Sequence, residues 1–197
     1  MNKMPIPPTV RQGEHKILLA SGSPRRRELC TAMGLTFTIR TSDADESIEA
    51  GTPPREAVKL LSRRKAEAVL PEEAIVIAAD TVVALGDTIL GKPQSEAEAR
   101  AMLSMLSGKT HAVYTGVTVA YRGKFFTEAD ETLVTFRTLT EAEIAAYVAT
   151  GEPMDKAGAY GIQGKGGALV SAISGEFDNV VGLPCRLLAA LLQKAMH

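Results

Sequence analysis

The sequence has few cysteines and no long apolar run, and each absence excludes a class of protein. Cys30 and Cys185 both lie in apolar helical patterns, so we expect buried free thiols in a reducing compartment, without a disulfide framework or a zinc site. No apolar stretch is long enough to cross a bilayer, and the N-terminal residues contain no hydrophobic signal segment. We therefore expect a cytoplasmic protein.

An excess of charge of either sign is also missing. The chain has 22 Lys and Arg against 23 Asp and Glu, a formal net charge of -1. This balance argues against nucleic acid or an anionic membrane as a partner, because both are bound through a broad positive potential. Basic clusters in this sequence are therefore interpreted as local sites.

Histidine is scarce as well. Of the 3 histidines, only His111 lies away from the two ends of the chain. No serine or cysteine motif for acyl transfer accompanies it, which argues against a histidine-dependent catalytic triad.

The length and the patterning indicate one α/β domain. The chain has 197 residues, of which 45% are hydrophobic, and it contains no internal repeat. We expect residues 1–16, which are rich in proline, to form a flexible leader, and residues 17–197 to form a single domain. Apolar periodicity and turn signals predict the following elements: strands at 17–20, 35–40, 74–79, 111–121, 124–137 and 168–174, a hairpin at 82–90, and helices at 24–33, 53–70, 95–107, 140–150 and 184–192.

The stretch from residue 17 to residue 29 is the most unusual part of the chain. A short apolar strand leads into a turn of small residues, and then Ser23 and Pro24 suit the N-cap and first position of a helix. The three arginines at 25–27 oppose the dipole of that helix unless an anion binds at its N-terminus. A phosphate cradle and a surface helix with a basic first turn both agree with these residues.

Asp80 and the acidic loop at 43–49 are two further candidate sites. Asp80 follows the apolar strand 74–79 directly, and a carboxylate at the end of a buried strand is costly unless it is paired or functional. Catalytic carboxylates often lie at such strand ends, which favours a functional reading. The acidic loop at 43–49 is a solvated loop, or a magnesium site if a phosphate site lies nearby.

A glycine-rich stretch lies near the end of the chain. Residues 155–167 contain five glycines in thirteen residues, which excludes a regular helix or strand. Gln163 lies in this stretch, and its amide could read the edge of a nucleobase. The alternative is a flexible surface loop, which would leave Tyr160 and Ile162 poorly placed.

Five motifs in this order resemble the Maf family of nucleoside triphosphate pyrophosphatases, and the match runs from Leu18 to about Leu192. The motifs are Leu-Ala-Ser-Gly-Ser-Pro-Arg-Arg (19–26), Ala-Asp-Thr-Val-Val (79–83), Gly-Lys-Pro (91–93), Asp-Lys-Ala-Gly-Ala-Tyr-Gly-Ile-Gln-Gly (155–164) and Val-Val-Gly-Leu-Pro (180–184). The resemblance implies hydrolysis of a nucleoside triphosphate to the monophosphate and pyrophosphate. It also implies an elongated mixed sheet flanked by helices, with two lobes and a central cleft, similar to the inosine triphosphatases.

The resemblance further implies roles for individual residues. Asp80 matches the proton acceptor that activates water, and Glu46 matches an acidic position associated with a divalent metal cation (Mg, Mn or Co). Three positions match those associated with substrate choice: Arg25, Thr81 and Gln163. Four positions match the polar and cationic lining of the phosphate site: Ser21, Arg26, Lys65 and Lys92.

The motifs resemble one subfamily more than another. Asp-Thr at 80–81 and Gly-Ala-Tyr-Gly-Ile-Gln-Gly at 158–164 resemble members that act on dTTP and UTP, so we expect these substrates and modified pyrimidine triphosphates. Two alternatives stay open: the same reaction on 7-methyl-GTP, and a nucleotide-binding regulator of septum formation without turnover. The resemblance also implies a homodimer.

Overall fold

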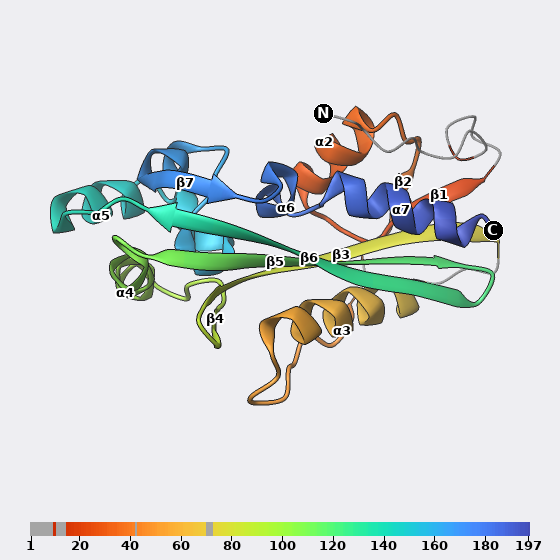
Figure 1. Cartoon of the computed structure of the whole chain (residues 1–197), viewed down its shortest axis with the longest axis horizontal. Helices are drawn as coiled ribbons and strands as arrows, with labels where there is room; N and C mark the ends of the chain where they lie inside the picture. Colours follow the sequence, from red (N-terminus) through yellow and green to blue (C-terminus); the bar gives the residue numbers. More distant parts are fainter. Residues whose placement is uncertain (1–9, 11–14, 42, 70–72) are drawn as a thin grey trace.

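The computed structural model describes residues 10, 15–41, 43–69 and 73–197. Over these residues a seven-stranded mixed sheet runs along an elongated molecule, with helices gathered toward its two ends (Figure 1). The strand order is β2-β1-β3-β5-β6-β7, and β4 pairs with β3 outside this order. The predicted α/β class and the elongated mixed sheet are confirmed.

The central strands are much longer than those at the edges. β1 pairs in parallel with β2 and β3, and the other pairs are antiparallel. The strands are β1 (Lys16–Leu19), β2 (Thr38–Ile39), β3 (Ala74–Leu85), β4 (Thr88–Leu90), β5 (Thr110–Tyr121), β6 (Lys124–Phe136) and β7 (Val170–Ser174). Because β3, β5 and β6 extend through both ends of the molecule, they hold the two groups of helices in one frame.

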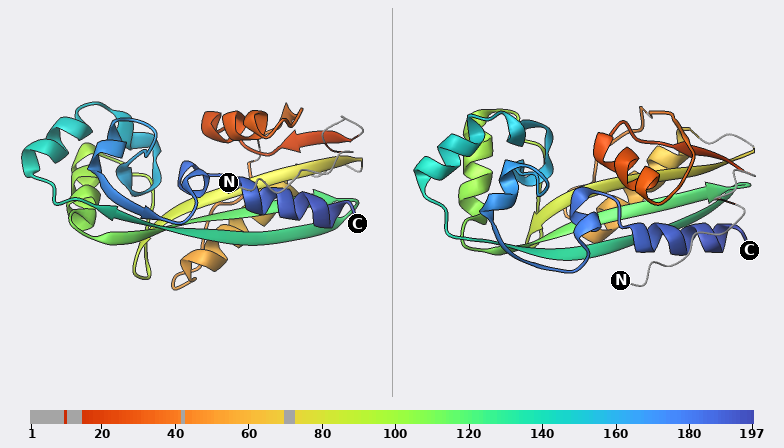
Figure 2. Two further views of the ribbon diagram at one scale, coloured as in Figure 1. Left: turned by 45° about the horizontal axis from the view of Figure 1, so that its top comes forward. Right: turned by 90° about the horizontal axis from the view of Figure 1, so that it is seen from above.

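The helices are α2 (Pro24–Ala32), α3 (Pro54–Glu67), α4 (Glu96–Leu106), α5 (Glu141–Val148), α6 (Phe177–Val181) and α7 (Cys185–Ala195). Three 3₁₀ turns, η1 (Glu152–Asp155), η2 (Ala157–Ala159) and η3 (Lys165–Leu169), occupy most of the glycine-rich stretch. Figure 2 shows α2, α3 and α7 around one end of the sheet, which we call the first lobe, and α4 and α5 at the other end, the second lobe.

The first lobe has apolar residues on both faces of the sheet. Alternate residues of a strand point to opposite faces. Ile77 accordingly packs in a cluster with residues of α2 and α7, and Ala78 packs in a cluster with residues of α3. Burial on both faces explains why 74–79 is a continuous apolar run without alternation.

The second lobe has its own core. Leu103 of α4, Val148 of α5 and Phe136 of β6 pack there with Tyr160, in a cluster separate from those of the first lobe. Two separate cores on one sheet confirm the predicted division into two lobes.

Several predicted elements differ from the structure. The predicted strand 35–40 is observed only at Thr38–Ile39, because only these two residues pair with β1. Ile39 is 45% exposed, so the alternating pattern did not correspond to a half-buried strand. Helix α3 ends at Glu67, three residues before the predicted end, which lies outside the described residues. Helix α6 was not predicted, because five residues are too few for a helical period to show.

The sequences at the N-termini of α4 and α5, Ser95 to Glu98 and Thr140 to Glu143, both match a capping box, but only one box is complete. At α5 the box is complete: Thr140 Oγ1 accepts from the Glu143 amide, and the Glu143 carboxylate accepts from the Thr140 amide. At α4 the Ser95 hydroxyl accepts from the Glu98 amide, but the Glu98 carboxylate accepts from the amide of Gln94 instead. Only the first half of the second box is therefore present.

Most of the predicted leader lies outside the described residues. Of residues 1–16, the structure describes Val10, His15 and Lys16; Val10 is buried in the first-lobe core and Lys16 begins β1. Among the described residues no helix is long and apolar enough to span a membrane.

Candidate active site

A gap in the strand pairing of β3 forms the base of the candidate site. β1 pairs with β3 as far as Ile77, and β4 pairs with it from Val83 onward. Between these two points, this edge of β3 pairs with no strand in the described part of the chain, while the other edge pairs with β5 throughout. Asp80 and Thr81 lie in this gap, so their side chains are not covered by a neighbouring strand.

The prediction that the strand ends before Asp80 is wrong. β3 continues to Leu85 because β5 pairs with it from Val76 to Ala84. The strand that does end here is β1, whose carboxyl end leads through Ser21 into α2. The site thus lies at the carboxyl end of a parallel strand, as such sites commonly do, but that strand is the neighbour of the one expected.

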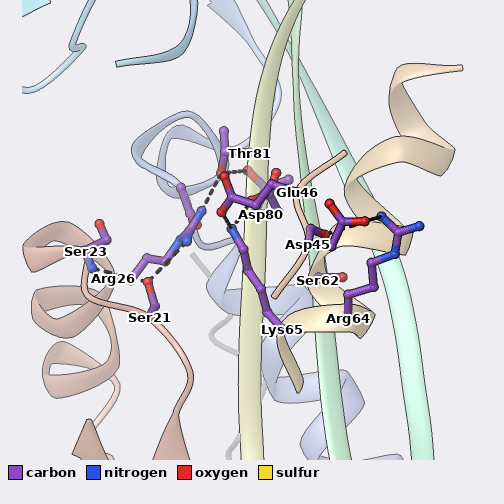
Figure 3. Close-up of polar contacts among 12 residues, drawn as sticks. Ser21, Ser23, Arg26, Asp45, Glu46, Ser62, Arg64, Lys65, Asp80 and Thr81 are labelled. Carbon is purple, nitrogen blue, oxygen red and sulfur yellow. Dashed lines mark hydrogen bonds and ion pairs between the residues drawn. The ribbon is translucent and has the colours of Figure 1, made fainter. Parts of the chain in front are cut away.

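Asp80 and Thr81 point to opposite faces of the sheet, as consecutive strand residues do. Asp80 faces α3, and its carboxylate Oδ1 accepts a hydrogen bond from Nζ of Lys65 at 2.5 Å. Thr81 faces α2 and α6, where its hydroxyl accepts from Arg26. Because the edge of β3 is open at this point, both faces contribute side chains to one site (Figure 3).

Close packing of helix α3 on β5 places Lys65 beside Asp80. A Cβ at Gly116, the residue paired with Asp80, would lie 2.2 Å from the carbonyl oxygen of Val58. One turn later, Ser62 Oγ lies 2.9 Å from Thr118 Oγ1. With the helix set this close to the sheet, the Lys65 side chain reaches back toward the helix N-terminus, as helical side chains do.

Lys65 joins two carboxylates. Its Nζ contacts both Asp80 and Glu46, and the distance to Glu46 Oε1 is 2.8 Å. The side chains of Lys65 and Asp80 are only 14% and 13% exposed. The hydrogen bond from Lys65, together with its positive charge, lowers the pKa of Glu46 below its usual value. The loop that carries Glu46 is attached to α3 by Arg64, which donates to the carbonyl oxygen of Ser47 at 2.6 Å.

Arg26 connects three separate parts of the first lobe. Its guanidinium donates to Ser21 Oγ at 3.2 Å, to Thr81 Oγ1 at 3.1 Å and to the carbonyl oxygen of Gly182 at 2.8 Å. Burial lowers the pKa of Arg26, an effect that the negative charge of Asp80 opposes. Its partners Ser21, Thr81 and Gly182 are uncharged groups, so an anion in the site would stabilise this partly buried cation.

The hydroxyl of Thr81 is oriented by a chain of buried hydrogen bonds. Thr115 donates its only hydroxyl proton to the carbonyl oxygen of Asn179 at 2.9 Å. The 2.9 Å contact between Thr81 and Thr115 therefore has Thr81 as the donor. Since Thr81 also accepts from Arg26, its hydroxyl proton is committed to the protein, and it can offer a ligand only an acceptor.

A cleft of about 800 Å³ extends from these residues to the second lobe. Asp80, Lys65 and Arg26 line one end, and Tyr160 and the glycine-rich stretch from Gly161 to Gly164 line the other. A smaller hollow of about 360 Å³ adjoins it, around the turn between β1 and α2. The cleft therefore carries the Asp80–Lys65 pair and Arg26 at the first lobe, and at the second lobe it is lined by the glycine-rich backbone together with Tyr160 and Gln163.

Residues 16–195 match the sequence profile of the family described as Maf-like protein. This chain belongs to the Maf-like family. It is 54% identical over 173 residues to a dTTP/UTP pyrophosphatase of Moorella thermoacetica, covering 86% of this chain and 89% of the relative. It is 50% identical over 188 residues to a dTTP/UTP pyrophosphatase of Bacillus cereus, with 93% of both chains covered. A solved HAM1 protein from Coxiella burnetii aligns with 92% of this chain and 100% of its own, at 14% identity and a TM-score of 0.49.

Every residue singled out by the family resemblance lines the Maf-like cleft or its adjoining hollow. Two contact groups form: Asp80 with Lys65 and Glu46, and Arg26 with Ser21 and Thr81. The other three line the walls at separate points: Arg25, Lys92 and Gln163. The structure thus brings together in space residues that lie up to 142 positions apart in the sequence.

Four further charged residues line the cleft: Glu28 on α2, and Glu152, Asp155 and Lys156 in the second lobe. Nζ of Lys156 lies 2.6 Å from Asp155 Oδ1 and donates to the backbone carbonyl of Glu152 at 2.7 Å. Asp155 and Lys156 open the fourth family motif, so the signal was present. Glu152 lies outside all five motifs, so only its contacts in the structure identify it as a residue of the site.

His111 is not part of the site. It is buried, its Nε2 lies 2.8 Å from the hydroxyl of Tyr160, and burial lowers its pKa to about 4. A neutral, buried imidazole held by a tyrosine serves the core of the second lobe, in agreement with the exclusion of a histidine-dependent triad.

The described residues contain no group of three or more His, Cys, Asp or Glu side chains that could hold a metal ion by themselves. Glu46 and Asp80 nevertheless approach a single cationic atom, Nζ of Lys65, from two sides. One or two carboxylates completed by phosphate oxygens and water are the donor set that Mg²⁺ commonly takes. The site therefore fits a divalent cation that arrives with a phosphate ligand.

Proposed function

We propose that this protein hydrolyses nucleoside triphosphates between the α- and β-phosphates, with dTTP and UTP preferred, to give the monophosphate and pyrophosphate. The observation that carries the proposal is the pairing of Asp80 with Lys65 at one end of a cleft whose other end carries Gln163. The names of relatives that are 50% identical or more over most of the chain agree with it.

The first-lobe end of the cleft suits a triphosphate. The N-terminus of α2, with Arg25 beside it, faces the cleft and the adjoining hollow, and Arg26, Lys65 and Lys92 line both. Backbone N–H groups at a helix start and cationic side chains together bind phosphate. The same cations stabilise the negative charge that develops on the pyrophosphate leaving group.

Asp80 is the residue we assign as general base. Water attacks the α-phosphorus, the bond from that phosphorus to the bridging oxygen breaks, and Asp80 takes the proton of the water. Lys65 holds one oxygen of the carboxylate and so orients it. A divalent cation such as Mg²⁺, held by Glu46 and Asp80 together with phosphate oxygens, would supply charge neutralisation at the same place.

The second-lobe end suits a pyrimidine. The amide of Gln163 offers one acceptor and two donors, and uracil and thymine share an imide edge with the complementary groups. Modified pyrimidine triphosphates with the same edge fit equally, which suits an enzyme that removes unwanted nucleotides from the pool.

The test is pyrophosphate release from a panel of canonical and modified nucleoside triphosphates with magnesium, using the wild-type protein beside Asp80→Asn. We expect dTTP and UTP to be preferred, with activity lost in the variant. Preference for 7-methyl-GTP would keep the reaction and overturn the assigned specificity. Binding of nucleotide without release of pyrophosphate would favour the regulator of septum formation.

The homodimer and the cytoplasmic location stay predictions. Sedimentation of the purified protein tests whether it is a homodimer.

A further inference from the structure

The glycine-rich segment that carries Gln163 wraps around a single carboxylate, that of Glu152. Glu152 Oε1 accepts a hydrogen bond from the amide of Gly166 at 3.0 Å, and Oε2 accepts one from the amide of Lys165 at 3.0 Å. On the other side of Gln163, the amide of Gly161 donates to the hydroxyl of Tyr147 at 3.1 Å, and this hydroxyl donates to Glu152 Oε1 at 3.0 Å. The segment is thus attached to Glu152 on both sides of the glutamine.

The glycines of this segment lie very close to the side chains of Glu152, Tyr147 and Lys156. A Cβ at Gly164 would lie 2.5 Å from Glu152 Oε1, and one at Gly166 would lie 2.6 Å from the hydroxyl oxygen of Tyr147. A Cβ at Gly161 would lie 2.6 Å from Cε of Lys156. At Gly164 and Gly166 a side chain would collide with the groups that hold the segment, so glycine at these two positions follows from the hydrogen bonds to Glu152 and Tyr147.

The charge of Glu152 strengthens these bonds. Burial raises the pKa of this carboxyl, but hydrogen bonds from Gly166, Lys165 and Tyr147 and the charge of Lys156 outweigh burial, so that its pKa lies below the usual value. The group is therefore an anion at neutral pH. Hydrogen bonds to a charged acceptor are stronger than those between neutral groups.

We propose that Glu152 is a positioning residue for nucleobase selection, because it holds the segment that presents Gln163 to the cleft. The inference rests on the proposed function. Glu152 makes no contact with Asp80 or Lys65, so its effect falls on the choice of base and leaves the chemical step in place.

The kinetic test compares Glu152→Gln with wild type on UTP and ATP. Glutamine has the same shape as glutamate, but one carboxylate oxygen is replaced by an NH₂ group. This group cannot accept a hydrogen bond from the backbone N–H of Lys165 or Gly166, so at least one of the hydrogen bonds to the segment is lost. We expect the ratio of kcat/KM for UTP to that for ATP to fall about tenfold, mainly through KM, the loss typical of one hydrogen bond to a charged group. Tyr147→Phe, which removes the bond on the other side of Gln163, should shift the ratio in the same direction.

Two controls separate positioning from loss of stability. Glu143→Gln changes the same type of side chain in the same lobe but away from the cleft, where Glu143 bonds Thr140 and Arg137, and it should leave the ratio unchanged. In a Gln163→Ala background, Glu152→Gln should change the ratio little further, because the group it positions is gone. A full, additive effect in that background would overturn the proposal.

Amide hydrogen exchange tests the inference without turnover. The amides of Lys165 and Gly166 should exchange faster in Glu152→Gln than in the wild type, while those of β5 keep their protection. Unchanged protection, or an unchanged UTP to ATP ratio in an active variant, would refute the role of Glu152 alone. Wild-type protein that hydrolyses no triphosphate would instead refute the proposed function, and the exchange result would still decide whether Glu152 holds the segment.

Discussion

The two ends of the cleft are built in different ways. At the first-lobe end, side chains on regular elements contact each other directly: Lys65 of α3 contacts Asp80 of β3, and Arg26 of α2 bonds Thr81 of β3. These elements are packed over both faces of the sheet. At the second-lobe end, the wall is the irregular segment between the 3₁₀ turns η2 and η3, which is held by hydrogen bonds to Glu152 and Tyr147. Rigid elements suit a reaction that needs fixed geometry, and a loop suits a surface that selects among bases.

The comparison predicts that substitutions at the first-lobe end change turnover, and that substitutions at the second-lobe end change the choice of substrate. The largest effect is expected for Asp80→Asn. Removal of the base should lower kcat about 10²- to 10⁴-fold on every triphosphate. Lys65 keeps Glu46 as a counter-ion, so thermal stability should change little. Turnover near the wild-type level would exclude Asp80 as the base.

Gly116→Ala tests whether the distance between α3 and the sheet positions the catalytic pair. The new Cβ would meet the carbonyl of Val58 at 2.2 Å, so α3 has to move away from β5. We expect a loss of about 1–3 kcal/mol in the free energy of unfolding, together with a lower kcat, because Lys65 moves with the helix. Denaturant unfolding and pyrophosphate release measure the two effects.

The matched control for this change is Gly91→Ala, since a Cβ at Gly91 meets nothing within 4 Å and its φ is not positive. It should unfold at the wild-type denaturant concentration. If Gly116→Ala behaved like this control, the close packing of α3 would not be needed.

Gln163→Glu tests selection at the second-lobe end. The substitution keeps the shape of the side chain but removes its two amide donors and adds a negative charge. We expect kcat/KM for dTTP and UTP to fall about tenfold, with smaller changes for other triphosphates, as measured on the same panel. Equal losses for all triphosphates would mean that Gln163 does not read the base.

The smallest effect is expected from the pH dependence of stability at Glu46. Lys65 lowers the pKa of this carboxyl below its unfolded value of 4.5, so the ion pair stabilises the fold above that pH. The contribution is lost as the pH falls through the lowered folded value. Because the Glu46 side chain is 66% exposed, we expect no more than about 1 kcal/mol.

Denaturant unfolding of wild type and Glu46→Gln at pH 7 and in acid measures this contribution. The difference in stability between the two proteins should be present at pH 7 and should shrink well below pH 4.5. A difference that stayed constant over this range would show that the carboxylate charge is not its source.

Most of the regular elements could be predicted from local pattern. The apolar run 74–79, the alternation in 124–137 and the capping box at Thr140 each carry a signal within a few residues, and each corresponds to an observed strand or helix. The two errors in the strands have a common cause. The end of β3 and the shortness of β2 depend on which strands lie beside them, and no local pattern states the neighbour.

The candidate site divides in the same way. The family resemblance singled out Asp80, Lys65 and Gln163, because residue types and their order are properties of the chain itself. Motifs did not mark Glu152 or Thr115, since the roles of these two residues come from hydrogen bonds to segments that are distant in sequence or irregular in structure.

The sequence by itself determined the family, the order of the elements and the kinds of chemical group available, because these follow from residue identity and local periodicity. Only the tertiary structure decided where β1 ends beside β3, how closely α3 packs on Gly116, and which carboxylate holds the glycine-rich segment. These features depend on contacts between residues far apart in the chain, whose geometry is set by the packing of whole elements against one sheet.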